Sequence, residues 1–357
     1  MGRPKKLFSQ RNIRAMNKLL YGDRRFRPEN RVGLLVPLYA PHETNDHSDN
    51  NQNKSIITID LLNNTCTPIQ SENISQLTSH ELENIRNRIR ITFENKKKLY
   101  KFLCQAIDKK RLFLSKGLGI PYLFYTLIRS AKYKKKIRLL DAEIQSWQRK
   151  YEAYFLNLKV PIGEELKEKY RKLQASFKKV CHCCYIWDAV ERNGIADVQT
   201  EQKIHHIYFY NKKTVTFTET EMDILKYEFP ALFLGNANGA DLYIFPRFII
   251  LLQSNGIAVL DIREIQLEGK VIPYIETSCP HDAHIVDYKW SHARKNGSQD
   301  MRYKQNFQIP IVHYFQLNLT SVKGLNESYI FSNRDYGENF YNNFKDYIQS
   351  ANQKFIR

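Results

Sequence analysis

The feature that most constrains the fold is a run of large apolar residues between residues 133 and 158, spaced alternately four and three positions apart. Its members are Tyr133, Ile137, Leu140, Ile144, Trp147, Tyr151, Tyr154 and Leu158. This spacing is the heptad seam of a long helix that packs along another helix. Because aromatic rings are large for the seam of a slim two-stranded dimer, the pattern favours a partner helix from the same chain.

A further helix is predicted on each side of this seam. The apolar positions of the two flanking helices are Leu82, Ile85, Ile89, Leu99, Leu103 and Ala106 before the seam, and Leu166, Tyr170, Leu173, Phe177 and Val180 after it. Thr78 and Glu81 form a capping box at the start of the first helix, in which Thr92 and Lys96 are polar interruptions. Residues 78–192 are therefore predicted to form a helical hairpin of coiled-coil character or a three-helix unit.

After Asn193 and Gly194 the apolar period changes to two, which is typical of strands. The expected strands are 204–210, 214–217, 241–252, 256–260, 262–267, 309–319 and 328–331, with a short helix at 219–227. Pro246 predicts an edge or a bulge within the longest run. A final amphipathic helix at 333–350 is expected to bury Phe340, Phe344, Tyr347 and Ile348. The predicted fold class is α+β: a long helical hairpin, then an antiparallel β-rich domain over residues 200–357, closed by a C-terminal helix.

The N-terminal part divides into a basic arm, residues 1–30, and a segment of short strands around a polar loop, residues 31–77. Strands are expected at 32–39 and 55–62. The first residues, Gly-Arg-Pro-Lys-Lys from Gly2, resemble the core of an AT-hook, in which proline extends the backbone so that arginine can enter a narrow minor groove. A solvated basic tail is the alternative interpretation.

The composition indicates a polyanionic partner. Lys and Arg number 55 against 37 Asp and Glu, which gives a formal net charge of +18. Such an excess attracts phosphates, with nucleic acid as the first candidate and an anionic membrane surface as the second. The alternative is a composition inherited from an AT-rich genome, which also enriches Lys, Asn and Ile.

The candidate phosphate-binding residues lie on the arm and on the faces opposite the helical seams. They are Arg3, Lys5, Lys6, Arg24, Arg25, Lys96, Lys97, Lys98, Lys109, Lys110, Lys134, Lys135 and Lys136. A charge run is usually a solvated face. Charges of one sign on paired helices repel, however, and this repulsion costs stability unless an anion offsets it.

The six cysteines are unevenly spaced and do not form a disulfide framework. No signal peptide is expected after Met1, and no apolar run reaches the roughly 20 residues that a membrane helix needs. These features predict a cytoplasmic protein without a cofactor. Thiolate and imidazole donors could make a zinc site from Cys181, Cys184, Cys279 and His281. The Cys-x-Cys step from Cys181 to Cys183 is poor spacing for structural zinc, however, and the two clusters lie roughly 95 residues apart in the sequence.

A nuclease core is the enzymatic alternative. Asp241, Asp261 and Glu268 could hold magnesium, with Lys270 near the scissile phosphate. The Glu268-Gly-Lys270 step is predicted to fall at a turn, where such a core would need a strand. Surface salt bridges are the alternative role for these residues.

The C-terminal region resembles a pleckstrin-homology-like (GRAM-like) domain of the bacterial type. The resemblance rests on the layout of antiparallel strands before one helix, on 241–247 and 256–263, and on Phe331 followed by Phe340 and Phe344. It implies a scaffold, a protein-docking module or a reader of anionic lipid. The insertion at 272–306 departs from the minimal domain.

A second resemblance is to a recurring C-terminal segment of uncharacterised bacterial proteins. It is carried by Trp290, Gly297, Ser298, Gln299, Asp300, Met301, Arg302, Asn306, Ile309, Pro310 and Tyr314. The segment implies no activity, and Asp300 and Arg302 are predicted to be a structural pair. It suggests a bacterial source, with a mobile-element or antiphage system as a possible setting.

These observations lead to three functional hypotheses. The first is a non-enzymatic nucleic-acid-binding or adaptor protein that contacts phosphates through its arm and helical hairpin. The second is the metal-dependent nuclease. The third is a peripheral membrane or protein-docking module.

Overall fold

The computed structural model describes residues 66–116, 130–158, 161–254 and 256–353. The basic arm and the strands expected at 32–39 and 55–62 lie outside these residues. The chain divides into two compact units. We call residues 87–158 with 222–226 the helical unit, and the described residues of 66–86, 161–221 and 227–353 the β unit.

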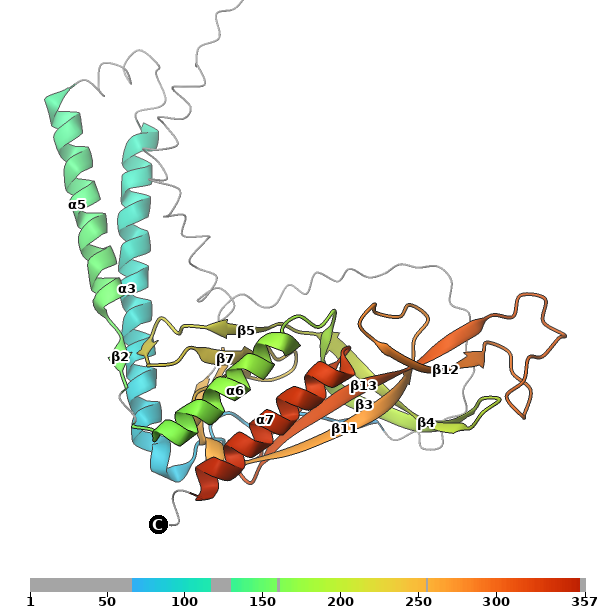
Figure 1. The fold of residues 1–357 in the computed structure, drawn as a ribbon. Helices are drawn as coiled ribbons and strands as arrows, with labels where there is room; N and C mark the ends of the chain where they lie inside the picture. The colour runs from blue at the N-terminus through green and yellow to red at the C-terminus, as the bar shows by residue number, and fades with distance from the viewer. Residues whose placement is uncertain (1–65, 117–129, 159–160, 255, 354–357) are drawn as a thin grey trace, which may run out of the picture. The chain divides into compact units, whose positions relative to one another are not determined.

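The helical unit contains α3 (Glu83–Lys116), which starts in the β unit, and α5 (Ala131–Ala153). The two helices run antiparallel side by side (Figure 1). Their rings meet in pairs along the contact: Phe113 with Tyr133, Phe102 with Trp147, and Tyr100 with Tyr151, at centroid distances of 4.9, 5.0 and 5.9 Å. The predicted seam thus lies against a helix of the same chain.

The end of the seam differs from the prediction. Helix α5 ends at Ala153, and Tyr154 is already extended. The chain then forms β2 (Leu156–Asn157), which pairs in parallel with β6 (Leu225–Lys226). Backbone pairing therefore replaces the last helical turn, and the short helix expected at 219–227 is not formed.

The third expected helix, α6 (Glu164–Val180), belongs to the β unit. It packs against α7 (Arg334–Gln353), where Tyr170 meets Tyr347 and Phe177 meets Phe340 at centroid distances of 5.4 and 5.5 Å. The prediction of one helical region over 78–192 was therefore wrong for this helix. Heptad-like spacing requires only one buried face, and a sheet domain can bury that face as well as a second helix can.

Two antiparallel sheets form the rest of the β unit. The larger one contains β1 (Thr67–Pro68), β3 (Ile186–Gln199), β4 (Ile204–Thr214), β11 (Ile265–Ile275), β12 (His284–Trp290), β13 (Gln308–Ser321) and β14 (Asn326–Phe331). Its path runs β1-β3-β14-β13-β11, with β4 beside β3 and β12 beside β13. The smaller sheet has the order β10-β9-β8-β7-β5 and contains β5 (Phe217–Thr220), β7 (Ala231–Leu234), β8 (Asp241–Ile244), β9 (Phe248–Gln253) and β10 (Gly256–Asp261).

One apolar core joins α6, α7 and residues of both sheets. The predicted face of α7 is confirmed, because Phe340, Phe344, Tyr347 and Ile348 are all buried in this core. The fold is thus α+β, with helices followed by antiparallel sheets and a C-terminal helix. No helix within the described residues is long and apolar enough to cross a membrane.

Two strand boundaries also differ from the prediction. Strand β3 starts at Ile186 and continues through Asn193 and Gly194, where the pairing with β4 shifts register. The predicted β-rich domain, which began at residue 200, therefore left out β3. The run 241–252 is two strands, β8 and β9, and Pro246 lies in the turn between them, where its missing N–H costs no ladder hydrogen bond.

Candidate nucleic-acid interface

Positive charge is concentrated in two parts of the chain. Residues 87–116, 130–158 and 222–226 carry 18 Lys and Arg against 6 Asp and Glu, and residues 1–65 carry 11 against 6. The rest of the chain is almost balanced, with 26 against 25. The helical unit therefore holds most of the excess, which a uniform bias of composition would have spread over both units.

The first turns of α5 carry the densest part of this charge. Lys132, Lys134, Lys135, Lys136 and Arg138 are all exposed, and the first turn contains no acidic residue. Ser130 caps the helix by accepting a hydrogen bond from the Tyr133 N–H at 3.2 Å. Cations at this end lower the stability of the helix, because the positive pole of the helix dipole lies at the N-terminus and repels them. The same end favours an anion, because its backbone N–H groups point outward.

Part of the predicted basic surface is neutralised within the helical unit. Lys109 pairs with Glu143 at 3.1 Å and Lys110 with Asp141 at 2.6 Å. Both pairs join α3 to α5, so they hold the helices together as well as cancelling charge. The exposed lysines of α3 that remain for a ligand include Lys98 and Lys101.

Lys96 was wrongly placed among the phosphate ligands. Its side chain is buried, its ammonium donates to the backbone carbonyl of Asp223, and it lies 4.5 Å from the ring centroid of Tyr151. Burial lowers the pKa of Lys96, while the Asp223 and Glu152 carboxylates act in the opposite direction. Lys96 therefore anchors the 222–226 segment to the helices.

A substitution separates this structural role from binding. Lys96→Met should lower the free energy of unfolding by about 1–3 kcal/mol, because the Asp223 carbonyl loses its donor, and should not change any binding that depends on the exposed cations. Lys98→Met, at an exposed position of the same helix, should leave the free energy of unfolding unchanged. If the exposed cations bind phosphates, it should weaken binding and make the slope of log affinity against log salt shallower by about one. Urea unfolding and anisotropy titrations measure the two effects. Loss of affinity in Lys96→Met with unchanged stability would contradict the assignment.

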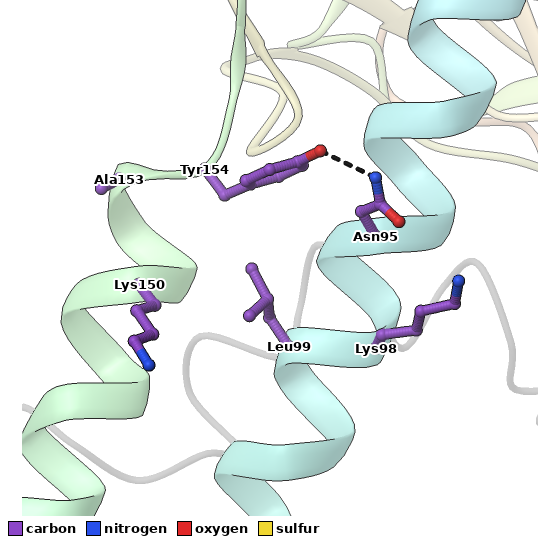
Figure 2. A pocket seen from close by; sticks show the side chains of 6 residues that line it. All are labelled: Asn95, Lys98, Leu99, Lys150, Ala153 and Tyr154. Atoms are coloured by element: carbon purple, nitrogen blue, oxygen red, sulfur yellow. Dashed lines mark hydrogen bonds between the residues drawn. The ribbon is translucent and has the colours of Figure 1, made fainter.

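An open hollow of about 520 Å³ lies between α3 and α5. It is lined by Asn95, Lys98, Leu99, Lys150, Ala153 and Tyr154 (Figure 2). Asn95 Nδ2 donates to the Tyr154 hydroxyl at 2.8 Å, and the amine of Lys98 points away from α5 (Figure 2). The hollow is thus a gap between the two helices, and its polar side chains do not point toward a common centre (Figure 2).

The four residues of the nuclease hypothesis are not brought together. Asp241 and Asp261 pair with opposite ends of β9, at Leu252 and Phe248, while Glu268 and Lys270 lie in the other sheet. Asp261 is held by Arg263 at 2.7 Å, and Glu268 accepts from Asn318 at 3.2 Å. Glu268-Gly-Lys270 lies within β11 and not at the predicted turn. A strand is thus present, but the carboxylates do not share a site.

The four residues of the zinc hypothesis are brought together only in part. Cys184 Sγ lies 3.0 Å from His281 Nδ1, so two of the four predicted ligands do meet. Cys181 instead packs against the main core and Cys279 against the separate cluster around Trp187. Within the part of the chain that the structure describes, no three His, Cys, Asp or Glu side chains are grouped so that they could hold a metal ion.

The structure adds residues that the sequence pattern did not single out. Asp223 lies in a segment that follows β5 in sequence yet belongs to the helical unit, and its carboxylate accepts from the Tyr151 hydroxyl at 3.3 Å. No local signal in the sequence predicts this long-range contact.

Comparisons with protein-family models, with curated proteins and with solved structures find nothing that matches this chain.

Proposed function

We propose that the protein binds nucleic acid through phosphate contacts from the exposed basic residues of α3 and α5, with the N-terminal arm adding further contacts. The observation that carries this proposal is the excess of 18 basic over 6 acidic residues in residues 87–116, 130–158 and 222–226. Its densest part faces solvent at the positive end of a helix, where it opposes folding. Lysines at this position lower the stability of the free protein. A bound polyanion would offset this cost by neutralising their charge.

The proposed contacts predict how binding should behave. Lysine ammonium groups neutralise phosphates without reading base edges, so affinity should fall steeply with salt and depend little on sequence. The two antiparallel helices would act as a hairpin of coiled-coil character that presents these groups on a stiff rod. The β unit would be a scaffold or a docking site for a protein partner.

The direct test is fluorescence anisotropy of the purified protein with labelled duplex DNA, single-stranded DNA and RNA over a salt series. Tight binding that weakens steeply as salt rises supports the proposal. Vesicles with and without anionic lipid, tested in parallel, separate nucleic acid from a membrane surface. If none of the three nucleic acids binds at low salt, the proposal fails.

The stability cost can be measured separately at Lys132. Lys132→Glu places an acid in the first turn of α5, where the helix dipole favours it, and should raise the free energy of unfolding by about 0.3–1 kcal/mol at low salt. The same change should weaken nucleic-acid binding. Lys132→Gln should give an intermediate result in both measurements. A destabilised Lys132→Glu variant would mean that the lysine supports the fold.

A further inference from the structure

A second surface, on the β unit, combines exposed rings with cations. Within residues 288–307, Tyr288, Met301, Tyr303 and Phe307 are exposed by 47%, 72%, 47% and 48%. Single exposed apolar side chains are ordinary, whereas several grouped together are typical of interaction surfaces. This segment links β12 to β13, and we call it the β12–β13 loop region.

The same region is basic. Its exposed cations are Arg294, Lys295, Arg302 and Lys304. Its one carboxylate is Asp300, which is buried and held by Arg302 through hydrogen bonds of 3.0 and 2.6 Å. The acid is therefore shielded while the cations face solvent, although the β unit as a whole is nearly neutral.

Hydrogen bonds and a close backbone contact brace the loop. Asn306 accepts from the Ser291 hydroxyl and the His292 N–H at 3.0 and 3.1 Å, and donates to the His292 carbonyl at 2.7 Å. Gly297 has φ +82° and lies against Thr200, whose backbone carbon would be 2.2 Å from an added Cβ. A loop fixed in this way loses little entropy when it binds.

The rings offer a stacking surface. His292 and Tyr303 are parallel, at 3.9 Å between centroids and 8° between planes, and both are exposed. An exposed ring beside cations is the combination that takes up unpaired bases, since each base has a π-face and each nucleotide a phosphate. In a duplex the bases are already stacked on each other, so they cannot use this surface.

We propose that the β12–β13 loop region binds single-stranded nucleic acid, with bases stacked on Tyr303 and Phe307 and phosphates contacted by Arg294, Lys295 and Lys304. This inference rests on the proposed function and narrows it. The helical unit supplies contacts that any nucleic acid can use, and the loop region adds a preference for unpaired strands. DNA and RNA share the chemistry that the rings and cations recognise.

The test uses the full chain and three labelled probes of about 20 nucleotides, a length that exceeds the site of a single binding module: oligo-deoxythymidine, oligo-uridine and a DNA duplex. Tyr303→Ala with Phe307→Ala should weaken binding of the single-stranded probes by about tenfold or more, with duplex binding unchanged. Tyr303→Phe, which keeps a ring, should retain wild-type affinity. Tyr185→Ala with Tyr336→Ala removes two exposed rings elsewhere on the β unit and is the matched control.

The outcomes separate the two proposals. Selective loss of single-strand binding supports the loop region, and the two single-stranded probes show whether DNA or RNA is preferred. Wild-type protein that binds duplex but not single strands overturns this inference alone. The same holds if the Tyr303 and Phe307 double variant binds single strands as the wild type does. Wild-type protein that binds no probe overturns the proposed function as well.

Discussion

Replacing Lys134, Lys135 and Lys136 together with glutamate should weaken binding to duplex DNA by about 100-fold at moderate salt. All three side chains are exposed in the first turns of α5, and no ion pair within the described residues involves them. Each phosphate contact that is lost removes about one released counterion, so the plot of log affinity against log salt should become shallower by about three. Anisotropy titrations at several salt concentrations give both quantities.

A matched variant separates local contacts from net charge. Lys172→Glu, Lys179→Glu and Lys323→Glu change the formal charge by the same amount on exposed positions of the β unit. This control should reduce long-range attraction slightly but leave the salt slope nearly intact. Equal effects of the two triple variants would show that total charge, and not the surface of α5, governs binding.

The helices were the most predictable part of the fold, because a helix with one buried face must repeat its apolar residues every three to four positions. The seam of α5 and the buried face of α7 both followed from this rule. The rule does not say what covers the face. Leu166 to Val180 of α6 continue the spacing of α5, yet they pack in the core of the β unit.

The strand boundaries were less predictable, because a strand can continue through residues that resemble turns. Asn193 and Gly194 lie inside β3, where a register shift absorbs them. Conversely, the apolar run from Asp241 to Leu252 contains a tight turn that only Pro246 indicated. The pleckstrin-like interpretation of this region stays a prediction.

The candidate interface could be predicted in outline from charge alone, since runs of lysine are visible in the sequence. Lys96 is the exception. Lys96 occupies a seam position between Ile89 and Leu99, so the same periodicity that predicted α3 also placed this lysine on the buried face. The periodicity therefore predicted a buried Lys96, whereas the run of three lysines suggested an exposed one. For Asp300 and Arg302 the sequence was sufficient, because their predicted pairing is confirmed.

Buried carboxylates of the β unit were not predictable, because their burial depends on contacts far apart in the chain. Glu327 in β14 is 1% exposed and accepts hydrogen bonds from the Ser71 hydroxyl at 2.5 Å and from Asn236 Nδ2 at 2.6 Å. Burial raises the pKa of Glu327 to about 8, and the nearby Asp188 carboxylate adds to the rise. Burial also raises the pKa of Asp188 to about 6.

This shift fixes the sign of a pH effect on stability. The folded state keeps the proton of Glu327 up to a pKa of about 8, whereas the ordinary value is 4.5. The folded protein therefore binds more protons than the unfolded chain between these values, and the free energy of unfolding falls as pH rises through that window. The loss attributable to Glu327 should be on the order of 4 kcal/mol between pH 5 and pH 8.

Glu327→Gln should remove most of this dependence. Glutamine imitates the neutral carboxyl: its carbonyl can accept from Asn236, and its amide can donate to the Ser71 hydroxyl, which rotates to accept. The variant should match the wild type near pH 5 and exceed its free energy of unfolding by several kcal/mol near pH 9. Urea unfolding at pH values from 5 to 9 measures the difference, and Glu221→Gln, at an exposed carboxylate of the same unit, should leave the profile unchanged. In the variant, the free energy of unfolding should still fall as pH rises toward about 6, because the pKa of Asp188 is also raised in the folded state. Parallel profiles for wild type and Glu327→Gln would mean that Glu327 is ionised in the folded protein, so that its two hydrogen bonds outweigh the cost of burying the charge.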